Sequence, residues 1–151
     1  MIFAAIGDTG YNVVLLLHIL TAFAAFAPVF AHPLIANQAT KGDDAERSRI
    51  IGYLTANGRR IYAPALIVTG LLGFALQGMS EEVWGFDQTW FILAIVVWIA
   101  MNGLLHGVIL PTERAMAEGD FSTESRLNIA GPAITILLVV MLWLMIFKPF
   151  L

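Results

Sequence analysis

Four long stretches of this chain contain no Asp, Glu, Lys or Arg. Each has at least 20 residues, and they cover positions 9–40, 61–80, 88–112 and 127–147. A helix needs about 20 apolar residues to cross the hydrocarbon core of a bilayer, and lipid cannot satisfy an open backbone, so a spanning segment is helical. The pattern predicts an all-α, four-helix transmembrane bundle, with helices near residues 11–32, 61–79, 88–110 and 127–147.

The composition supports a membrane protein and narrows the functions to consider. Hydrophobic residues make up 59% of the chain and charged residues 13%, against about 25% charged residues in soluble domains. We expect one integral membrane domain over residues 1–151 that contacts the lipid bilayer. The absence of cysteine excludes disulfides and thiolate ligands. No long basic run is present, so nucleic-acid binding is not expected.

Basic residues are distributed unevenly over the connections. Seven of the eight lie between the first and second or between the third and fourth predicted helices, and Lys148 stands alone near the C-terminus. By the positive-inside rule those two connections are cytoplasmic and both termini lie on the outer side. No Lys or Arg precedes the first stretch, which is too long for a signal-peptide core, so we expect it to be retained. The predicted location is the inner (cytoplasmic) membrane, as a multi-pass protein.

Two segments of the sequence predict how parts of the chain pack against the membrane surface or against neighbouring helices. The stretch "ATKGDDAERSRIIGYLTANGRR" (39–60) is either a short amphipathic helix lying on the inner membrane surface or a solvated loop. In the third predicted helix, Gly103 and Gly107 form a small-xxx-small pair, which is typical of close helix contacts in lipid. We therefore expect these two glycines to face a neighbouring helix.

Polar side chains inside the predicted spans are the candidate functional residues, because they normally face the bundle interior. His18 and His32 share one face of the first helix, and Asn102 and His106 share one face of the third. We expect both faces to point inward. Glu113, further along the third helix, is interpreted as a helix cap or a partner of Arg60 or Arg114.

Depth in the membrane separates the histidines. At the helical rise, His18 lies roughly 6 Å to the outer side of the bilayer centre, His32 roughly 15 Å and His106 roughly 9 Å to the inner side. His32 and His106 therefore share a layer, in which a metal cluster with Glu113 is conceivable. Met141, in the fourth helix, is the sulfur ligand at the depth of His18.

Each candidate ligand also has a structural interpretation. His18 could hydrogen-bond to Thr21 or Thr135, and Met141 could be a core residue. His32 lies near the inner interface, where it could reach water and headgroups and would need no partner. The sequence does not identify a metal ion that these residues would bind. No P-loop, zincin or serine-hydrolase pattern is present, so the sequence gives no reason to expect an enzyme.

The stretches "LLLHILTAFAAFAPVFAHPL", "RRIYAPALIVTGLLGFALQG" and "ILPTERAM" resemble an uncharacterised family of small bacterial four-helix integral membrane proteins. That family is distantly similar to the HemJ-type and copper-resistance D-type proteins. The resemblance to the HemJ type implies b-type haem and a ligand at His18. The key lysine of that type has no counterpart in the third helix, because the only lysines are Lys41 and Lys148. Porphyrinogen oxidation is therefore not expected.

Two functional hypotheses follow. The first is a haem-b-binding protein with an electron-transfer or redox accessory role, with cofactor ligands among His18, His106, Met141 and His32. The second is a non-catalytic structural protein, either a homo-oligomer or an accessory subunit of a larger membrane complex. Under the second hypothesis the histidines are interhelical hydrogen-bonding groups. A small transporter fits less well, because no formally charged residue lies within a span.

Overall fold

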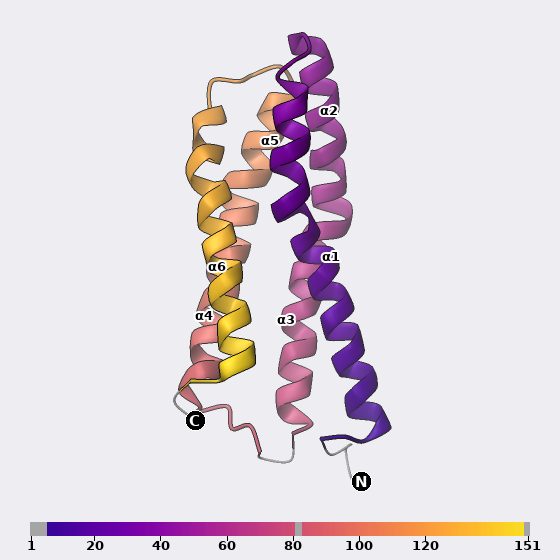
Figure 1. Ribbon diagram of the computed structural model, residues 1–151, viewed down its shortest axis with the longest axis vertical. Helices are drawn as coiled ribbons and strands as arrows, with labels where there is room; N and C mark the ends of the chain where they lie inside the picture. The colour runs from indigo at the N-terminus through magenta and orange to yellow at the C-terminus, as the bar shows by residue number, and fades with distance from the viewer. Residues whose placement is uncertain (1–5, 81–82, 150–151) are drawn as a thin grey trace.

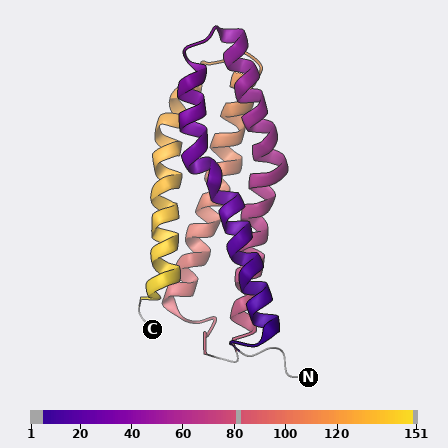
Figure 2. The same cartoon turned by 45° about the vertical axis from the view of Figure 1, so that its right-hand side comes forward.

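Four long rods of helix run side by side along the molecule, as the sequence predicts (Figures 1 and 2). The computed structural model describes residues 6–80 and 83–149. The helices in these residues are α1 (Thr9–Ala39), α2 (Asp44–Asn57), α3 (Ala63–Gly78), α4 (Thr89–Leu104), α5 (Leu110–Ala117) and α6 (Leu127–Phe147). Two π-helical turns, Gly58–Tyr62 and Leu105–Ile109, join α2 to α3 and α4 to α5. A short 3₁₀ turn, Glu124–Arg126, leads into α6.

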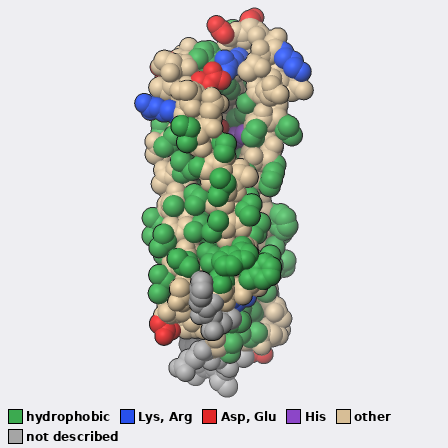
Figure 3. All heavy atoms as spheres, turned by 60° about the vertical axis from the view of Figure 1, so that its left-hand side comes forward, with side chains coloured by type: hydrophobic (Ala, Val, Ile, Leu, Met, Phe, Trp, Pro, Cys, Tyr) green, Lys and Arg blue, Asp and Glu red, His purple; other side chains and the backbone are tan. Residues whose placement is uncertain are grey.

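All four rods are long and apolar enough to cross a membrane: Thr9–Ala39, Asp44–Gly78, Thr89–Ala117 and Glu124–Phe147. Large apolar side chains lie on their outer faces, for example Phe23, which is 72% exposed, and Phe30, which is 66% exposed. Figure 3 shows hydrophobic side chains over the middle of one face and charged side chains toward its two ends. An apolar surface this extensive is stable in lipid and not in water. The chain is a multi-pass membrane protein.

Three of the rods extend beyond the predicted helices at the end that carries most of the charge. The 31 residues of α1 correspond to about 46 Å, well beyond the roughly 30 Å hydrocarbon core. The stretch 39–60 is neither a loop nor a helix lying flat, because α2 continues α3 upright and buries Ile51. Asp43 caps α2 by accepting a hydrogen bond from the Glu46 N–H at 2.7 Å. Charged residues outside the hydrocarbon do not end a helix, so the charge-free runs underestimate its length.

The rods associate in pairs, with α1 along α3 and α4 along α6, while α2 packs on α5 at the charged end. The first and last described residues lie at the opposite end of the bundle (Figure 1). The termini therefore share one end, and the side of the bilayer that this end faces stays a prediction. The arrangement leaves space between the α1–α3 pair and the α4–α6 pair.

Gly70 and Gly73 of α3 make close helix contacts, whereas Gly103 of α4 and Gly107 of the following π turn do not. A Cβ added to Gly70 would lie 2.5 Å from Trp98 Cζ2, and one added to Gly73 would lie 3.3 Å from His18 Cε1. A Cβ at Gly103 or Gly107 would meet nothing within 4 Å. The expectation that Gly103 and Gly107 face a neighbouring helix of this chain is therefore wrong, because this side of the rod faces outward.

Candidate functional site

Two cavities lie between the helix pairs, and the predicted ligands are divided between them. The larger, of about 750 Å³, lies toward the termini and is lined by His18 and Met141. The smaller, of about 360 Å³, lies toward the charged end and is lined by His32. Both are within the usual range for small-molecule sites, about 300–1,000 Å³. The inward face predicted on α1 is confirmed, because both of its histidines line a cavity.

The imidazole of His18 is held by the neighbouring helix α3. Its Nδ1 lies 2.8 Å from the carbonyl oxygen of Thr69, and its ring packs on Gly73. A carbonyl only accepts, so Nδ1 carries the hydrogen and Nε2 keeps its lone pair in the neutral ring. No residue in the described part of the chain hydrogen-bonds to Nε2. This arrangement fixes the ring and leaves one nitrogen as an available ligand.

The partners expected for His18 from the sequence are wrong. The hydroxyl groups of Thr21 and Thr135 donate to carbonyls of their own helices, at Leu17 and Gly131. Thr69 was missed because its backbone carbonyl is the acceptor, and no side-chain pattern in a sequence marks such a group. Thr69 Oγ1 donates to the Ala65 carbonyl, as threonines in apolar helices often do.

Aromatic side chains build much of the larger cavity. Trp98 donates from Nε1 to the Leu66 carbonyl at 2.9 Å, which ties α4 to α3. Phe74 and Phe91 meet edge to face, with ring centroids 5.6 Å apart. Asn102 donates to the carbonyl of Trp98 in its own helix, so it does not link helices through this bond.

At the end of the larger cavity near the termini, a cation lies over two indole rings. Lys148 Nζ lies 4.8 Å from the ring centroid of Trp84 and 5.7 Å from that of Trp90. Trp90 is buried and lines the cavity. Among the described residues that line this cavity, Lys148 alone carries a formal charge. The larger cavity is thus an apolar chamber with one histidine in its wall and one cation near its end.

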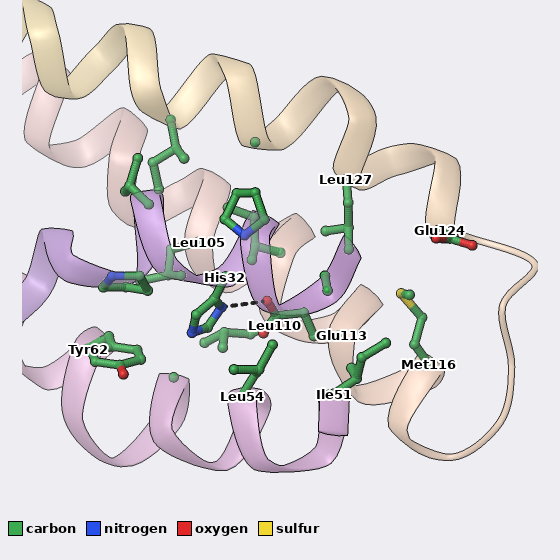
Figure 4. A pocket seen from close by; sticks show the side chains of 18 of the residues that line it. His32, Ile51, Leu54, Tyr62, Leu105, Leu110, Glu113, Met116, Glu124 and Leu127 are labelled. Carbon is green, nitrogen blue, oxygen red and sulfur yellow. Dashed lines mark hydrogen bonds and ion pairs between the residues drawn. The ribbon is translucent and has the colours of Figure 1, made fainter. Parts of the chain in front are cut away.

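The smaller cavity is built around a buried acid–base pair (Figure 4). His32 Nδ1 lies 3.1 Å from Glu113 Oε1, and the two side chains are only 16% and 9% exposed. The Tyr62 and His32 rings also meet edge to face, at a centroid distance of 5.5 Å. The expectations that His32 needs no partner and that Glu113 pairs with arginine are both wrong. The α4–α5 rod continues through Pro111, and this carries Glu113 into the interior beside α1.

His106 does not take part in either cavity. Its side chain is exposed on the outer side of the π turn Leu105–Ile109, so the expectation that it faces inward is wrong. Bulky residues of the same rod, Trp98, Met101 and Leu105, occupy the inward side instead. In the described residues no group of three or more His, Asp or Glu side chains could hold a metal ion, so the cluster of His32, His106 and Glu113 is not formed.

The chain matches no protein-family profile, no curated protein and no solved structure. Inferences about its function therefore rest on the geometry of the two cavities.

Proposed function

We propose that the protein binds haem b in the larger cavity and has an electron-transfer or redox accessory role. The observation that carries this proposal is the state of His18. Its Nδ1–H is fixed on the Thr69 carbonyl, and its Nε2 has no hydrogen-bond partner among the residues that the structure describes. Histidines that bind metals are commonly oriented in this way, through the second ring nitrogen.

The chemistry of the cavity walls fits a porphyrin. A porphyrin is a flat apolar ring with two carboxylates on one edge, and the cavity is an apolar, aromatic chamber that contains one cation. Lys148, near the end of the chamber, is suited to pair with a propionate. Bound haem would supply a one-electron carrier. The residues of the chain would hold it, exclude water around it and separate it from lipid.

The proposed ligands are His18 and Met141. They belong to different helix pairs, α1–α3 and α4–α6, and both line the same cavity. A histidine–methionine pair raises the reduction potential of haem above that of a bis-histidine pair. His32 and His106, the other ligands predicted from the sequence, do not line this chamber and are not assigned as ligands.

The test is a visible spectrum of the purified protein in mild detergent, oxidised and then reduced. We expect a Soret band, with sharp α and β bands after reduction, and their loss in His18→Ala. His106→Ala is the matched control, because it removes an exposed imidazole and should leave the spectrum unchanged. Met141→Leu should keep haem bound and shift its potential. A colourless, folded wild-type protein from haem-replete cells contradicts the proposal.

A second candidate, an accessory subunit or a homo-oligomer, is favoured by the exposed face of α4 and its π turn. Gly103, His106 and Gly107 are exposed on this face, and a Cβ added at either glycine would meet nothing within 4 Å in the described residues. An imidazole facing lipid is unfavourable, whereas one facing a second protein can be hydrogen-bonded. Cross-linking of a cysteine at position 103 in native membranes tests this candidate, with the outward Val139 position on α6 as control. Equal cross-linking at both positions contradicts it.

For the location, we propose the inner membrane of a bacterium with both termini on the outer side. The charge distribution supports this orientation, because most basic residues lie at the end of the bundle opposite to the termini.

A further inference from the structure

The larger cavity opens sideways between α1 and α6. Among the described residues of its wall, the exposed ones all belong to these two helices: Ile19, Phe23, Ala27 and Phe30 of α1, and Leu142 and Ile146 of α6. The wall residues that α3 and α4 contribute are buried or half-buried. The two helices also diverge toward the termini (Figures 1 and 2). Because both helices are membrane spans, the opening between them faces lipid.

The walls behind this opening are suited to a hydrocarbon chain. Leu76, Phe91 and Ala94 are buried apolar residues that line the side opposite to it. The cavity measures about 750 Å³, and apolar cavities stay dry and take up apolar molecules. In a bilayer the apolar molecules at such an opening are the acyl chains of lipids. A lipid chain can therefore enter and replace the side-chain contacts that are missing in the space.

The one formal charge among the described wall residues lies at the level of the lipid headgroups. The 21 residues of α6 correspond to about 32 Å, close to the roughly 30 Å hydrocarbon core. Lys148 follows the last residue of this helix, beside Trp84 and Trp90, and tryptophan is typical of the interface. In the described residues its ammonium donates one hydrogen bond, to the Met145 carbonyl at 3.1 Å. An ammonium has three donors, so it can also bind a phosphate.

We propose that the larger cavity, when it contains no haem, binds an acyl chain of an anionic phospholipid whose phosphate pairs with Lys148. The chain enters between α1 and α6 and lies against the walls that α3 and α4 form. A lipid with a net negative charge is favoured over phosphatidylcholine, because the choline group offsets the charge of the phosphate. The inference does not rest on haem binding, and haem would have to displace the lipid.

The tryptophans of the chain provide a direct test, because bromine atoms on a lipid chain quench indole fluorescence at short range. Trp84, Trp90 and Trp98 line the cavity, whereas Trp143 is 44% exposed on α6 and does not. The Trp143→Phe variant therefore reports on the cavity. In bilayers of phosphatidylglycerol brominated midway along its chains, we expect its emission to be strongly quenched.

Two alanines of α1 supply a matched pair of variants in the Trp143→Phe background. Ala22 and Ala24 are both half-buried, but only Ala22 lines the cavity. Ala22→Phe fills part of the space and should reduce the quenching several-fold, while Ala24→Phe should leave it unchanged. Helix content is measured for each variant to confirm that it folds. The proposal is overturned if Trp143→Phe abolishes the quenching, or if the two alanine variants behave alike.

The headgroup preference is tested with the two lysines of the chain, Lys148 and the exposed Lys41. Brominated phosphatidylglycerol should bind about fivefold better than brominated phosphatidylcholine, the effect of one basic residue near anionic lipid. Lys148→Met should remove this preference and Lys41→Met should retain it. Equal binding of the two lipids by the wild type, or equal effects of the two lysine variants, contradicts the role of Lys148.

A last measurement uses the wild-type protein alone, in case a variant does not fold. Native mass spectrometry of protein released from nanodiscs with equal amounts of the two lipids should show one retained phosphatidylglycerol. Release without lipid, or with mainly phosphatidylcholine, overturns the proposal. These measurements use protein whose visible spectrum shows no haem. A colourless protein that retains the lipid therefore supports this inference even where it contradicts haem binding.

Discussion

Replacing Gly70 with alanine should destabilise the bundle more than any other change of one methyl group at the glycines of α3 and α4. The new Cβ would overlap Trp98 Cε2 and lie 2.5 Å from Cζ2. The indole cannot simply rotate away, because its Nε1–H donates to the Leu66 carbonyl at 2.9 Å. Overpacking costs about 1–3 kcal/mol and loss of the hydrogen bond about 1 kcal/mol, so about 2–4 kcal/mol is at stake.

The matched control is Gly103→Ala, in which the new Cβ meets nothing within 4 Å. Both variants gain the same intrinsic helix preference of alanine over glycine, about 1 kcal/mol, so the difference between them isolates the clash. The free energy of unfolding is measured by titrating dodecyl sulfate into mixed micelles and following helix content. If the two variants agree within about 0.5 kcal/mol, the spread of neutral surface changes, Trp98 does not pack on Gly70 as described.

Three further predictions concern single features. Trp98→Phe should lower the free energy of unfolding by about 1 kcal/mol in the same titration, because the hydrogen bond to the Leu66 carbonyl is lost; an unchanged value would show that the bond contributes nothing. Asp43→Ala should cost about 1 kcal/mol through loss of the α2 cap, while Asp44→Ala, one residue further on, should cost less. A C-terminal reporter fusion should be active on the outer side of the membrane, and a cytoplasmic signal would reverse the orientation proposed from the basic residues.

The spans could be predicted from sequence because the penalty for charge in hydrocarbon is large and local. All four charge-free runs became membrane-length helices. The helix ends could not be predicted from the same signal. Arg59 and Arg60 lie inside the continuous rod Asp44–Gly78, so charged residues do not mark the end of the helix. Hydropathy therefore locates the membrane-embedded part of a helix and says little about where the helix stops.

The face that points into the bundle was predicted correctly for α1 and wrongly for the α4–α5 rod. In α1, His18 and His32 identify the inward face, and both line cavities. The third rod is apolar on every side, so hydrophobic periodicity does not single out a face. The rule that polar residues face inward then predicted that His106 points into the bundle. In the structure Trp98 and Met101 occupy the inward side instead. The rule that polar residues face the interior holds for a complete assembly. It fails for a single chain if the polar face of that chain contacts another protein.

The pairing of His32 with Glu113 also reverses the ranking of the two α1 histidines that membrane depth implies. Depth places His32 near water, so its removal should be harmless and removal of His18 more damaging. In the structure His32 is the partner of a buried carboxylate, with Nδ1 3.1 Å from Glu113 Oε1. His18 accounts for one hydrogen bond to a backbone carbonyl, at 2.8 Å. A hydrogen bond to a charged group contributes about 1.5–3 kcal/mol, whereas an ordinary hydrogen bond contributes about 1 kcal/mol.

We therefore expect His32→Ala to lower the free energy of unfolding more than His18→Ala does when no haem is bound. A double-mutant cycle with Glu113→Gln separates the pair from the cavity that alanine leaves behind. If the two side chains interact as the 3.1 Å distance indicates, His32→Ala should be much less damaging in the Glu113→Gln background, with a coupling of about 1–3 kcal/mol. Strict additivity of the two changes would show that the carboxylate has another partner and that depth alone gives the right ranking.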